Sequence, residues 1–137
     1  MNEKKNLTIK ETFALAVQNH QKNNLRVAEN LYKEILKINP NHASAHNNLG
    51  IVFKALEEHQ KAKSCFQKAI EINPNYVNAH YNLGNTLKEL GEHKKAISCY
   101  EKAIQIQPNY AEAHNNLGTL FQALGECRKA KSCYEKA

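Results

Sequence analysis

The chain has 137 residues, 42% of them hydrophobic, and 19 Lys and Arg against 13 Asp and Glu give a formal net charge of +6. This length allows a substantial buried core, and no stretch approaches the roughly 18 consecutive apolar residues of a membrane-spanning helix. No apolar run follows the opening Met-Asn-Glu-Lys-Lys, so we expect no secretory leader and a soluble, cytoplasmic protein without a membrane partner.

A repeat of 34 residues runs along the chain. Gly50, Gly84 and Gly118 each end a segment Ala-His-x-Asn-Leu-Gly, and alanine, aromatic and proline residues recur at the same interval. A fixed period of this length is typical of solenoids, whose units bury their apolar faces against neighbours. We therefore expect a tail, residues 1–8, and a single array, residues 9–137, with units 9–42, 43–76, 77–110 and a truncated 111–137.

Each unit is predicted to form two helices joined by a turn, because apolar residues follow helical spacing on either side of a break. Thr8 and Glu11 form a capping-box pattern, so the first helix is expected to begin near Ile9. At the turn, Gly91 and Gly125 suit a left-handed residue that ends a helix, and the Asn23 of the first unit tolerates the same conformation. Glu57 occupies this position in the second unit, and it predicts a less regular turn there.

The second helix of each unit is expected to end before a proline, since proline disfavours helical geometry in the residue that precedes it. Asparagine follows each proline and is predicted to cap the next helix. The prolines are Pro40, Pro74 and Pro108, and the asparagines are Asn41, Asn75 and Asn109.

The repeated glycine lies inside the first helix of its unit, where glycine costs about 1 kcal/mol relative to alanine. Close approach of the paired helix would offset that cost. In the third unit we expect Gly84 to face the small Ala96, with Tyr100 filling the remaining gap.

Counted from residues 9, 43, 77 and 111, the units share Leu-Gly at positions 7 and 8, alanine at 20 and 27, an aromatic at 24 and proline at 32. The exceptions are Ala16 and Ile35 in the first unit, and the fourth unit ends before position 32. This pattern resembles the tetratricopeptide repeat family. The resemblance implies an all-α fold, an α-solenoid of helix-turn-helix repeats in a right-handed superhelix. The chain departs from the family at position 4, where His46, His80 and His114 replace the favoured tryptophan.

The resemblance also implies that one face of the first helices lines a concave groove, and we expect this groove to bind an extended peptide. Asparagine recurs there at position 6, and a carboxamide can both donate to and accept from a peptide backbone. This asparagine ladder is similar to the one in the tetratricopeptide arm of O-linked N-acetylglucosamine transferases. The alternative is that these asparagines serve contacts between helices. The candidate residues are Asn47, Asn48, Lys54, Tyr81, Asn82, Asn85, Lys88, Asn115 and Asn116.

No catalytic motif is present, so we expect neither enzymatic activity nor a cofactor. The recurring histidines lie one unit apart, too far to share a metal ion, and only His42 and His46 could do so. Two functions stay open: a scaffold for protein interactions, or the substrate-recruiting arm of a larger glycosyltransferase-type enzyme whose catalytic domain lies beyond this chain.

Cys65, Cys99 and Cys133 share one position in successive units, and stacking at about 10 Å exceeds the reach of a disulfide. We expect these thiols, and that of Cys127, to be reduced and structural.

Basic residues gather near the start of each second helix, with no interleaved aromatic residues. This indicates a solvated face, and a nucleic-acid patch is the alternative. The final helix carries Ala130, Cys133, Tyr134 and Ala137 on a face with no following unit, which predicts self-association through this uncapped helix.

Overall fold

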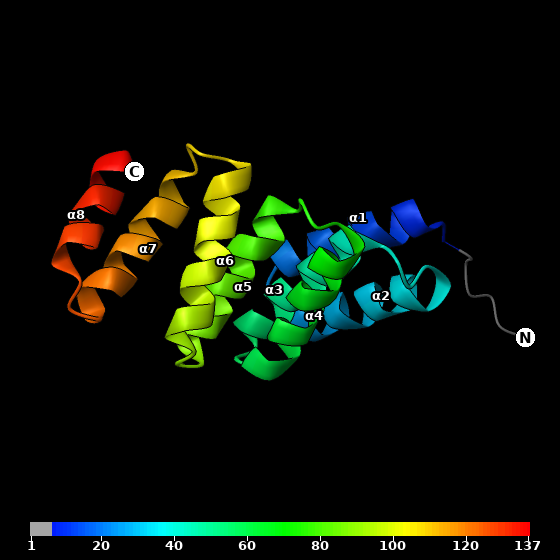
Figure 1. Cartoon of the computed structure of the whole chain (residues 1–137). Helices are drawn as coiled ribbons and strands as arrows, with labels where there is room; N and C mark the ends of the chain where they lie inside the picture. Colours follow the sequence, from blue (N-terminus) through cyan, green and yellow to red (C-terminus); the bar gives the residue numbers. More distant parts are fainter. Residues whose placement is uncertain (1–6) are drawn as a thin grey trace, which may run out of the picture. The chain divides into compact units, whose positions relative to one another are not determined.

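A computed structural model describes residues 7–137. The described chain forms eight α-helices and contains no strand, so the predicted all-α fold is confirmed (Figure 1). The helices are α1 (Ile9–Gln21), α2 (Leu25–Ile38), α3 (Ala43–Ala55), α4 (His59–Ile72), α5 (Val77–Glu89), α6 (His93–Ile106), α7 (Ala111–Ala123) and α8 (Cys127–Lys136). None of them combines the length and apolar character needed to cross a membrane.

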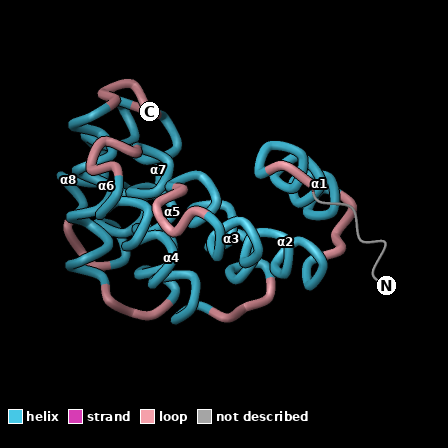
Figure 2. The backbone as a smooth tube through the Cα atoms, turned by 90° about the vertical axis from the view of Figure 1, so that its right-hand side faces the viewer, coloured by secondary structure: helices cyan, strands magenta, loops and turns pink. Residues whose placement is uncertain are grey.

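The described helices group into two compact parts, which comprise residues 7–72 and residues 73–137. Within the first part α1 packs on α2, α2 on α3, and α3 on α4. Within the second, α5 packs on α6, α6 on α7, and α7 on α8. Figure 2 shows that short loops join the helices inside each part. The right-handed superhelix and the single array concern how the parts are arranged, and both stay predictions.

The turn between paired helices is the same in all four repeats. Its residue in the left-handed region is Asn23, Glu57, Gly91 or Gly125, with φ of 64°, 61°, 79° and 80°. The less regular turn predicted at Glu57 is therefore wrong: this glutamate adopts the conformation that glycine adopts in the later repeats.

The repeated glycine does allow close approach of the paired helix. A β-carbon added to Gly84 would lie 2.8 Å from the ring of Tyr100, and one added to Gly50 would lie 2.6 Å from the ring of Phe66. Gly118 meets Tyr134 in the same way, at 2.9 Å. The aromatic ring fills the gap beside the glycine, as predicted. At Gly50 and Gly84 it supplies the three nearest atoms, so the alanine that was expected to face the glycine is not its closest neighbour.

The predicted asparagine caps are wrong, because α3, α5 and α7 begin one residue later than expected. Their N-cap residues are His42, Tyr76 and Tyr110. The Nδ1 atom of His42 accepts a hydrogen bond from the backbone N–H of Ala45 at 3.1 Å. The capping box at the start of α1 is confirmed, since Thr8 and Glu11 exchange hydrogen bonds of 2.9 and 3.0 Å.

The histidine at position 4 fixes the entry to each of these helices. The Nε2–H of His80 donates to the backbone carbonyl of Pro74, six residues earlier, at 2.8 Å. The same bond of 2.8 Å joins His46 to Pro40 and His114 to Pro108. Each histidine therefore ties the first turn of its helix to the preceding proline, a contact that sequence analysis missed.

The last helix is less open than predicted. Ala130 is 3% exposed and Cys133 9%, because both lie on the side of α8 that packs against α7. Only Tyr134, 40% exposed, and the terminal Ala137 lie open as expected.

Candidate functional site

The nine candidate groove residues lie on α3, α5 and α7. Most of their side chains are half-buried, and Asn115 is exposed. Asn47 is the exception: it is 3% exposed and interacts within the protein, so its place on the accessible surface was wrongly predicted. Asn115, which has the same side chain at the same position, is exposed, so the burial of Asn47 comes from its surroundings and not from the length of its side chain.

In the second part of the chain, three helices meet at a small polar network. The Nδ2 amide of Asn116 on α7 donates to the Oδ1 of Asn85 at 2.9 Å and to the hydroxyl of Tyr81 at 3.0 Å, both on α5. The hydroxyl of Tyr100 on α6 donates to the same Oδ1 of Asn85. Asn116 therefore uses its amide hydrogens inside the protein, while its own Oδ1 is left to accept a further bond.

Aromatic rings hold this network in place. The ring of Tyr81 stacks on that of Tyr110, with centroids 5.0 Å apart and planes inclined by 28°. Its centroid is also 6.1 Å from that of Tyr100. Burial raises the pKa of Tyr100 and of Tyr110, so both hydroxyls stay protonated and able to donate across the physiological pH range.

A related contact occurs in the first part of the chain. The Nδ2 amide of Asn48 on α3 donates to the hydroxyl of Tyr32 on α2 at 3.3 Å. Tyr32 is fully buried, and burial raises the pKa of its hydroxyl. Asn48 and Asn116, at equivalent positions, thus both direct their amide groups toward the preceding repeat. Asn82, the middle residue of the ladder, also interacts within the protein.

The two candidate lysines lie at helix ends. Lys54 is in the last turn of α3 and Lys88 in the last turn of α5, and both are half-buried. A positive charge there stabilises the helix, because the C-terminal carbonyl groups carry partial negative charge. These lysines consequently have a structural role independent of any ligand.

Two histidines and two thiols singled out in the sequence are engaged or partly buried within the protein. No group of three or more His, Cys, Asp or Glu side chains in residues 7–137 could hold a metal ion. His42 stacks on the ring of Phe13, with centroids 5.4 Å apart, and His46 donates to a backbone carbonyl, so both rings are engaged. Cys65 and Cys99 are free thiols, and burial raises the pKa of each to about 11. The side chain of Cys127 lies outside the described residues.

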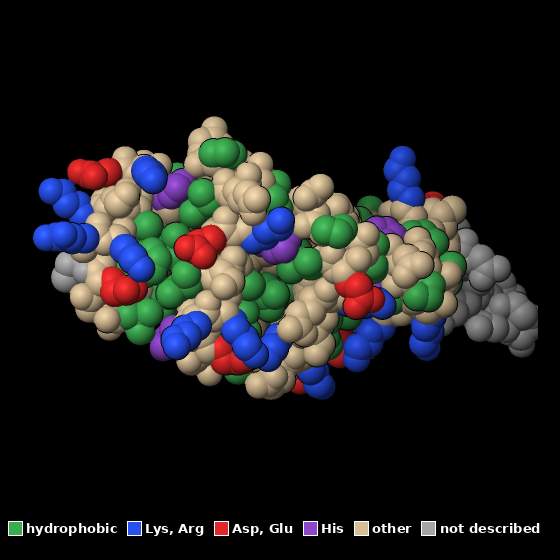
Figure 3. All heavy atoms as spheres, viewed as in Figure 1, with side chains coloured by type: hydrophobic (Ala, Val, Ile, Leu, Met, Phe, Trp, Pro, Cys, Tyr) green, Lys and Arg blue, Asp and Glu red, His purple; other side chains and the backbone are tan. Residues whose placement is uncertain are grey.

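Several of the basic residues at the start of the second helices pair with a glutamate three residues earlier. The distances are 3.3 Å for Lys61 and Glu58, 3.3 Å for Lys95 and Glu92, and 3.4 Å for Lys129 and Glu126. Figure 3 shows acidic side chains interspersed with basic ones on the face in view. This pairing fits the solvated face expected from the sequence.

Three sequence models of repeat families match the chain. Two described as tetratricopeptide repeat match residues 43–76 and 65–98, and one described as TPR repeat matches residues 84–125. The chain belongs to the tetratricopeptide repeat family. Residues 43–76 have the same bounds as the second unit expected from the sequence.

Solved structures of MamA resemble this tetratricopeptide repeat chain. One, titled "Crystal structure of MamA", is 28% identical, with a TM-score of 0.90 over 94% of this chain and 75% of that chain. A second, "Crystal structure of MamA protein", is also 28% identical, with a TM-score of 0.87 over 94% and 70%. MamA 41-end from Desulfovibrio magneticus RS-1, at 19% identity and a TM-score of 0.87 over 94% and 73%, shows the fold alone. No curated protein matches the chain in sequence.

Proposed function

We propose that this chain is a scaffold for protein interactions that binds an extended segment of a partner protein through the polar faces of its first helices: α3 in the first part, and α5 and α7 in the second. Membership of the tetratricopeptide repeat family supports a protein-binding role. The observation that carries the finer proposal is the half-buried asparagine that recurs at position 6 of three repeats: Asn48, Asn82 and Asn116.

The hydrogen bonds of this ladder narrow what a ligand must supply. The amides of Asn48 and Asn116 donate to tyrosine hydroxyls and to Asn85, so their carbonyl oxygens are the groups available to a partner. An extended peptide has backbone N–H groups that such oxygens can accept. The ladder would therefore act as a row of acceptors, rather than as the bifunctional amides that the sequence predicts.

We extend the proposal to the partners of the chain, its location in the cell and its self-association. It would bind a protein or peptide without catalysis, cofactor, nucleic acid or membrane, in the cytoplasm, and copies of the chain would associate through α8. Neither the described residues nor the matches support the alternative of a recruiting arm of a glycosyltransferase.

Binding selection from a library of random peptides tests the groove. Peptides of roughly 12 residues span about 40 Å when extended, enough to reach several rungs. Enriched peptides would be labelled, and their affinity for the wild type and for N48A/N82A/N116A measured by fluorescence anisotropy. We expect about a tenfold or greater loss of affinity, since each net hydrogen bond contributes roughly 1 kcal/mol.

The matched control is N30A/N75A/N109A, which removes three asparagines that are exposed on α2 and in loops. Circular dichroism would establish that both variants are folded at the assay temperature. Equal loss of affinity in the two variants, or no enriched peptide at all, would contradict the proposal.

A further inference from the structure

Each part of the chain holds an aromatic ring at the same position of a first helix, and only the ring of the second part carries a hydroxyl. Tyr81 on α5 and Phe13 on α1 are separated by two repeats, and both side chains are half-buried. Each ring stacks on the N-cap residue of the next first helix. The centroids are 5.0 Å apart for Tyr81 and Tyr110 and 5.4 Å apart for Phe13 and His42.

The hydroxyl of Tyr81 has a hydrogen to donate. Its oxygen accepts a hydrogen bond from the Nδ2 of Asn116 at 3.0 Å, so its own hydrogen points away from that amide. The Oδ1 of Asn85 already accepts two bonds, one from Asn116 at 2.9 Å and one from Tyr100, which use both of its lone pairs. No acceptor for the Tyr81 hydrogen is found among residues 7–137.

An acceptor lies beside this donor. Both hydrogens of the Asn116 amide are donated inside the protein, which leaves its Oδ1 to accept. This Oδ1 belongs to the same carboxamide group as the Nδ2 bonded to Tyr81, so it is a neighbour of the Tyr81 hydroxyl. A residue in an extended segment directs its N–H and its C=O to the same side, as paired residues of antiparallel strands do. One residue of a partner segment can therefore donate to Asn116 and accept from Tyr81.

Packing holds the Tyr81 hydroxyl in place before a partner binds. Its ring contacts those of Tyr110 and Tyr100, with centroids 5.0 and 6.1 Å away. A side chain that is already ordered loses little rotamer entropy on binding, so more of the energy of a new hydrogen bond is kept as affinity.

The first part offers an acceptor without this donor. Asn48, the equivalent of Asn116, donates to the fully buried hydroxyl of Tyr32 at 3.3 Å. Phe13 and Val17 occupy the positions of Tyr81 and Asn85, and neither has a polar side-chain atom. The pairing of donor and acceptor is therefore a property of the second part.

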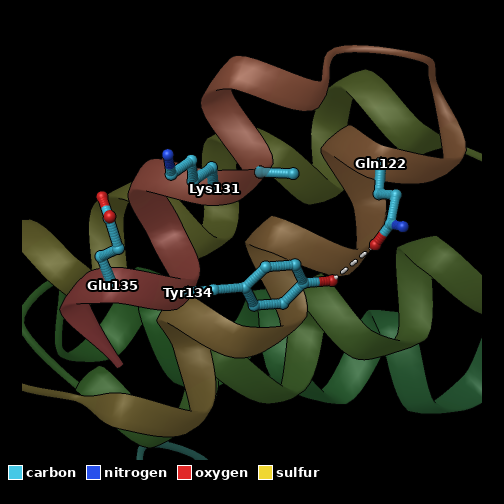
Figure 4. Close-up of a pocket in the computed structure, with 5 residues that line it drawn as sticks. Gln122, Lys131, Tyr134 and Glu135 are labelled. Atoms are coloured by element: carbon cyan, nitrogen blue, oxygen red, sulfur yellow. Dashed lines mark hydrogen bonds between the residues drawn. The ribbon is translucent and has the colours of Figure 1, made fainter.

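The tyrosine of the last helix shows that exposure alone does not supply a donor. The hydroxyl of Tyr134 is directed at Gln122 in a pocket lined by residues of α7 and α8 (Figure 4). It donates to the Oε1 of Gln122 at 3.1 Å. Tyr134 is 40% exposed and uses its hydrogen inside the protein, whereas the half-buried Tyr81 keeps its own for a ligand.

We propose that Tyr81 and Asn116 bind the C=O and the N–H of one and the same residue of the partner segment. This inference rests on the peptide binding proposed above and makes Tyr81 a specificity-determining residue of that site. The partner residue bound here cannot be proline, because proline has no N–H to donate to Asn116.

Ester substitutions in a bound peptide test the pair. An enriched peptide of about 12 residues from the random library would be resynthesised with each peptide bond in turn replaced by an ester. An ester before a residue removes its N–H, and an ester after it weakens its C=O as an acceptor. Fluorescence anisotropy would give the affinity of each peptide for the wild type, Asn116→Ala and Tyr81→Phe.

We expect two consecutive bonds at which an ester lowers the affinity of the wild type, by up to about fivefold each, the value of one net hydrogen bond. The loss at the first bond should disappear in Asn116→Ala, and the loss at the second should disappear in Tyr81→Phe. With the unmodified peptide, Tyr81→Phe should bind about fivefold more weakly than the wild type.

Tyr110→Phe is the matched control. It removes a hydroxyl from the ring on which Tyr81 stacks, and no described hydrogen bond joins that hydroxyl to Tyr81 or Asn116. This variant should bind as the wild type does, and circular dichroism would establish that all three variants are folded.

Three results would overturn the pair while leaving peptide binding intact. They are wild-type affinity in Tyr81→Phe, an equal loss in Tyr110→Phe, and ester effects that are not consecutive or that persist in both variants. A library without any enriched peptide would overturn this inference together with the proposed function.

Discussion

Replacing Glu57 with glycine should stabilise the protein. Glu57 has φ of 61°, close to the 79° of Gly91 at the same position of the next repeat. The surrounding bonds are also equivalent, because the backbone N–H of Glu57 donates to the Lys54 carbonyl at 3.0 Å and that of Gly91 to the Lys88 carbonyl at 3.0 Å. At the left-handed position itself the two turns differ in the side chain, which is glutamate in one and glycine in the other.

Two opposing terms set the size of the effect. The left-handed conformation costs a residue with a β-carbon roughly 1–2 kcal/mol. Glycine loses more backbone entropy on folding, and this loss offsets about 0.5–1 kcal/mol of the stabilisation gained. The net gain for Glu57→Gly is thus about 0–1.5 kcal/mol, centred at about 0.75 kcal/mol. The reverse change, Gly91→Ala, should destabilise by a similar amount, and it tests backbone conformation alone because an added β-carbon meets no atom within 4 Å.

Urea unfolding followed by far-ultraviolet circular dichroism measures both changes as shifts of the midpoint. Glu57→Ala serves as the control, because it removes the charge and keeps the β-carbon. If Glu57→Ala stabilises as much as Glu57→Gly, the charge rather than the backbone is responsible and the reasoning is refuted. A Gly91→Ala variant as stable as the wild type would refute it equally.

Two further predictions concern a glycine inside a helix of the second part and a carboxylate in the first part. Gly84→Ala should destabilise by about 1–3 kcal/mol despite the higher helix propensity of alanine, because the new β-carbon would lie 2.8 Å from the ring of Tyr100; chemical denaturation measures this, and a stabilised variant would contradict it. Burial acts to raise the pKa of Glu29, but hydrogen bonds from Lys33 at 2.7 Å and Arg26 at 2.9 Å lower it overall. Its charged form therefore adds stability that is present above the unfolded pKa of about 4.3 and is lost as pH falls through the lower folded value. The difference in thermal midpoint between the wild type and Glu29→Gln should therefore shrink as pH falls through this window. A difference that is the same at every pH would show that the charge of Glu29 does not contribute to stability.

The 34-residue period predicted where helices lie, because helix spacing and the glycine positions are local properties of the sequence. Gly84 could be assigned to a close approach for the same reason, since only a neighbouring helix explains a glycine inside a helix. Tyr100 was correctly placed in the gap, but the period does not specify distances, and the ring of Tyr100 rather than Ala96 supplies the atoms nearest to Gly84.

The hydrogen bonds of the candidate site were beyond sequence analysis. Asn116 was assigned to the groove by its position, but its bonds to Asn85 and Tyr81 depend on side-chain rotamers and on the lateral placement of α7 against α5. The burial of Asn47 depends in the same way on side chains that surround it. The repeat pattern does not determine side-chain rotamers or the lateral placement of one helix against another.

The bond from histidine to proline has a consequence for building new arrays. Donor and acceptor lie only six residues apart, in the segments 40–46, 74–80 and 108–114, so each segment contains everything needed to set its own junction. Hybrid proteins recombined from these repeats should therefore be joined at the turn inside a helix pair, near Gly91 or Gly125. A join between Pro108 and His114 would separate the two halves of one contact, and that contact would then no longer help to set the angle between α6 and α7.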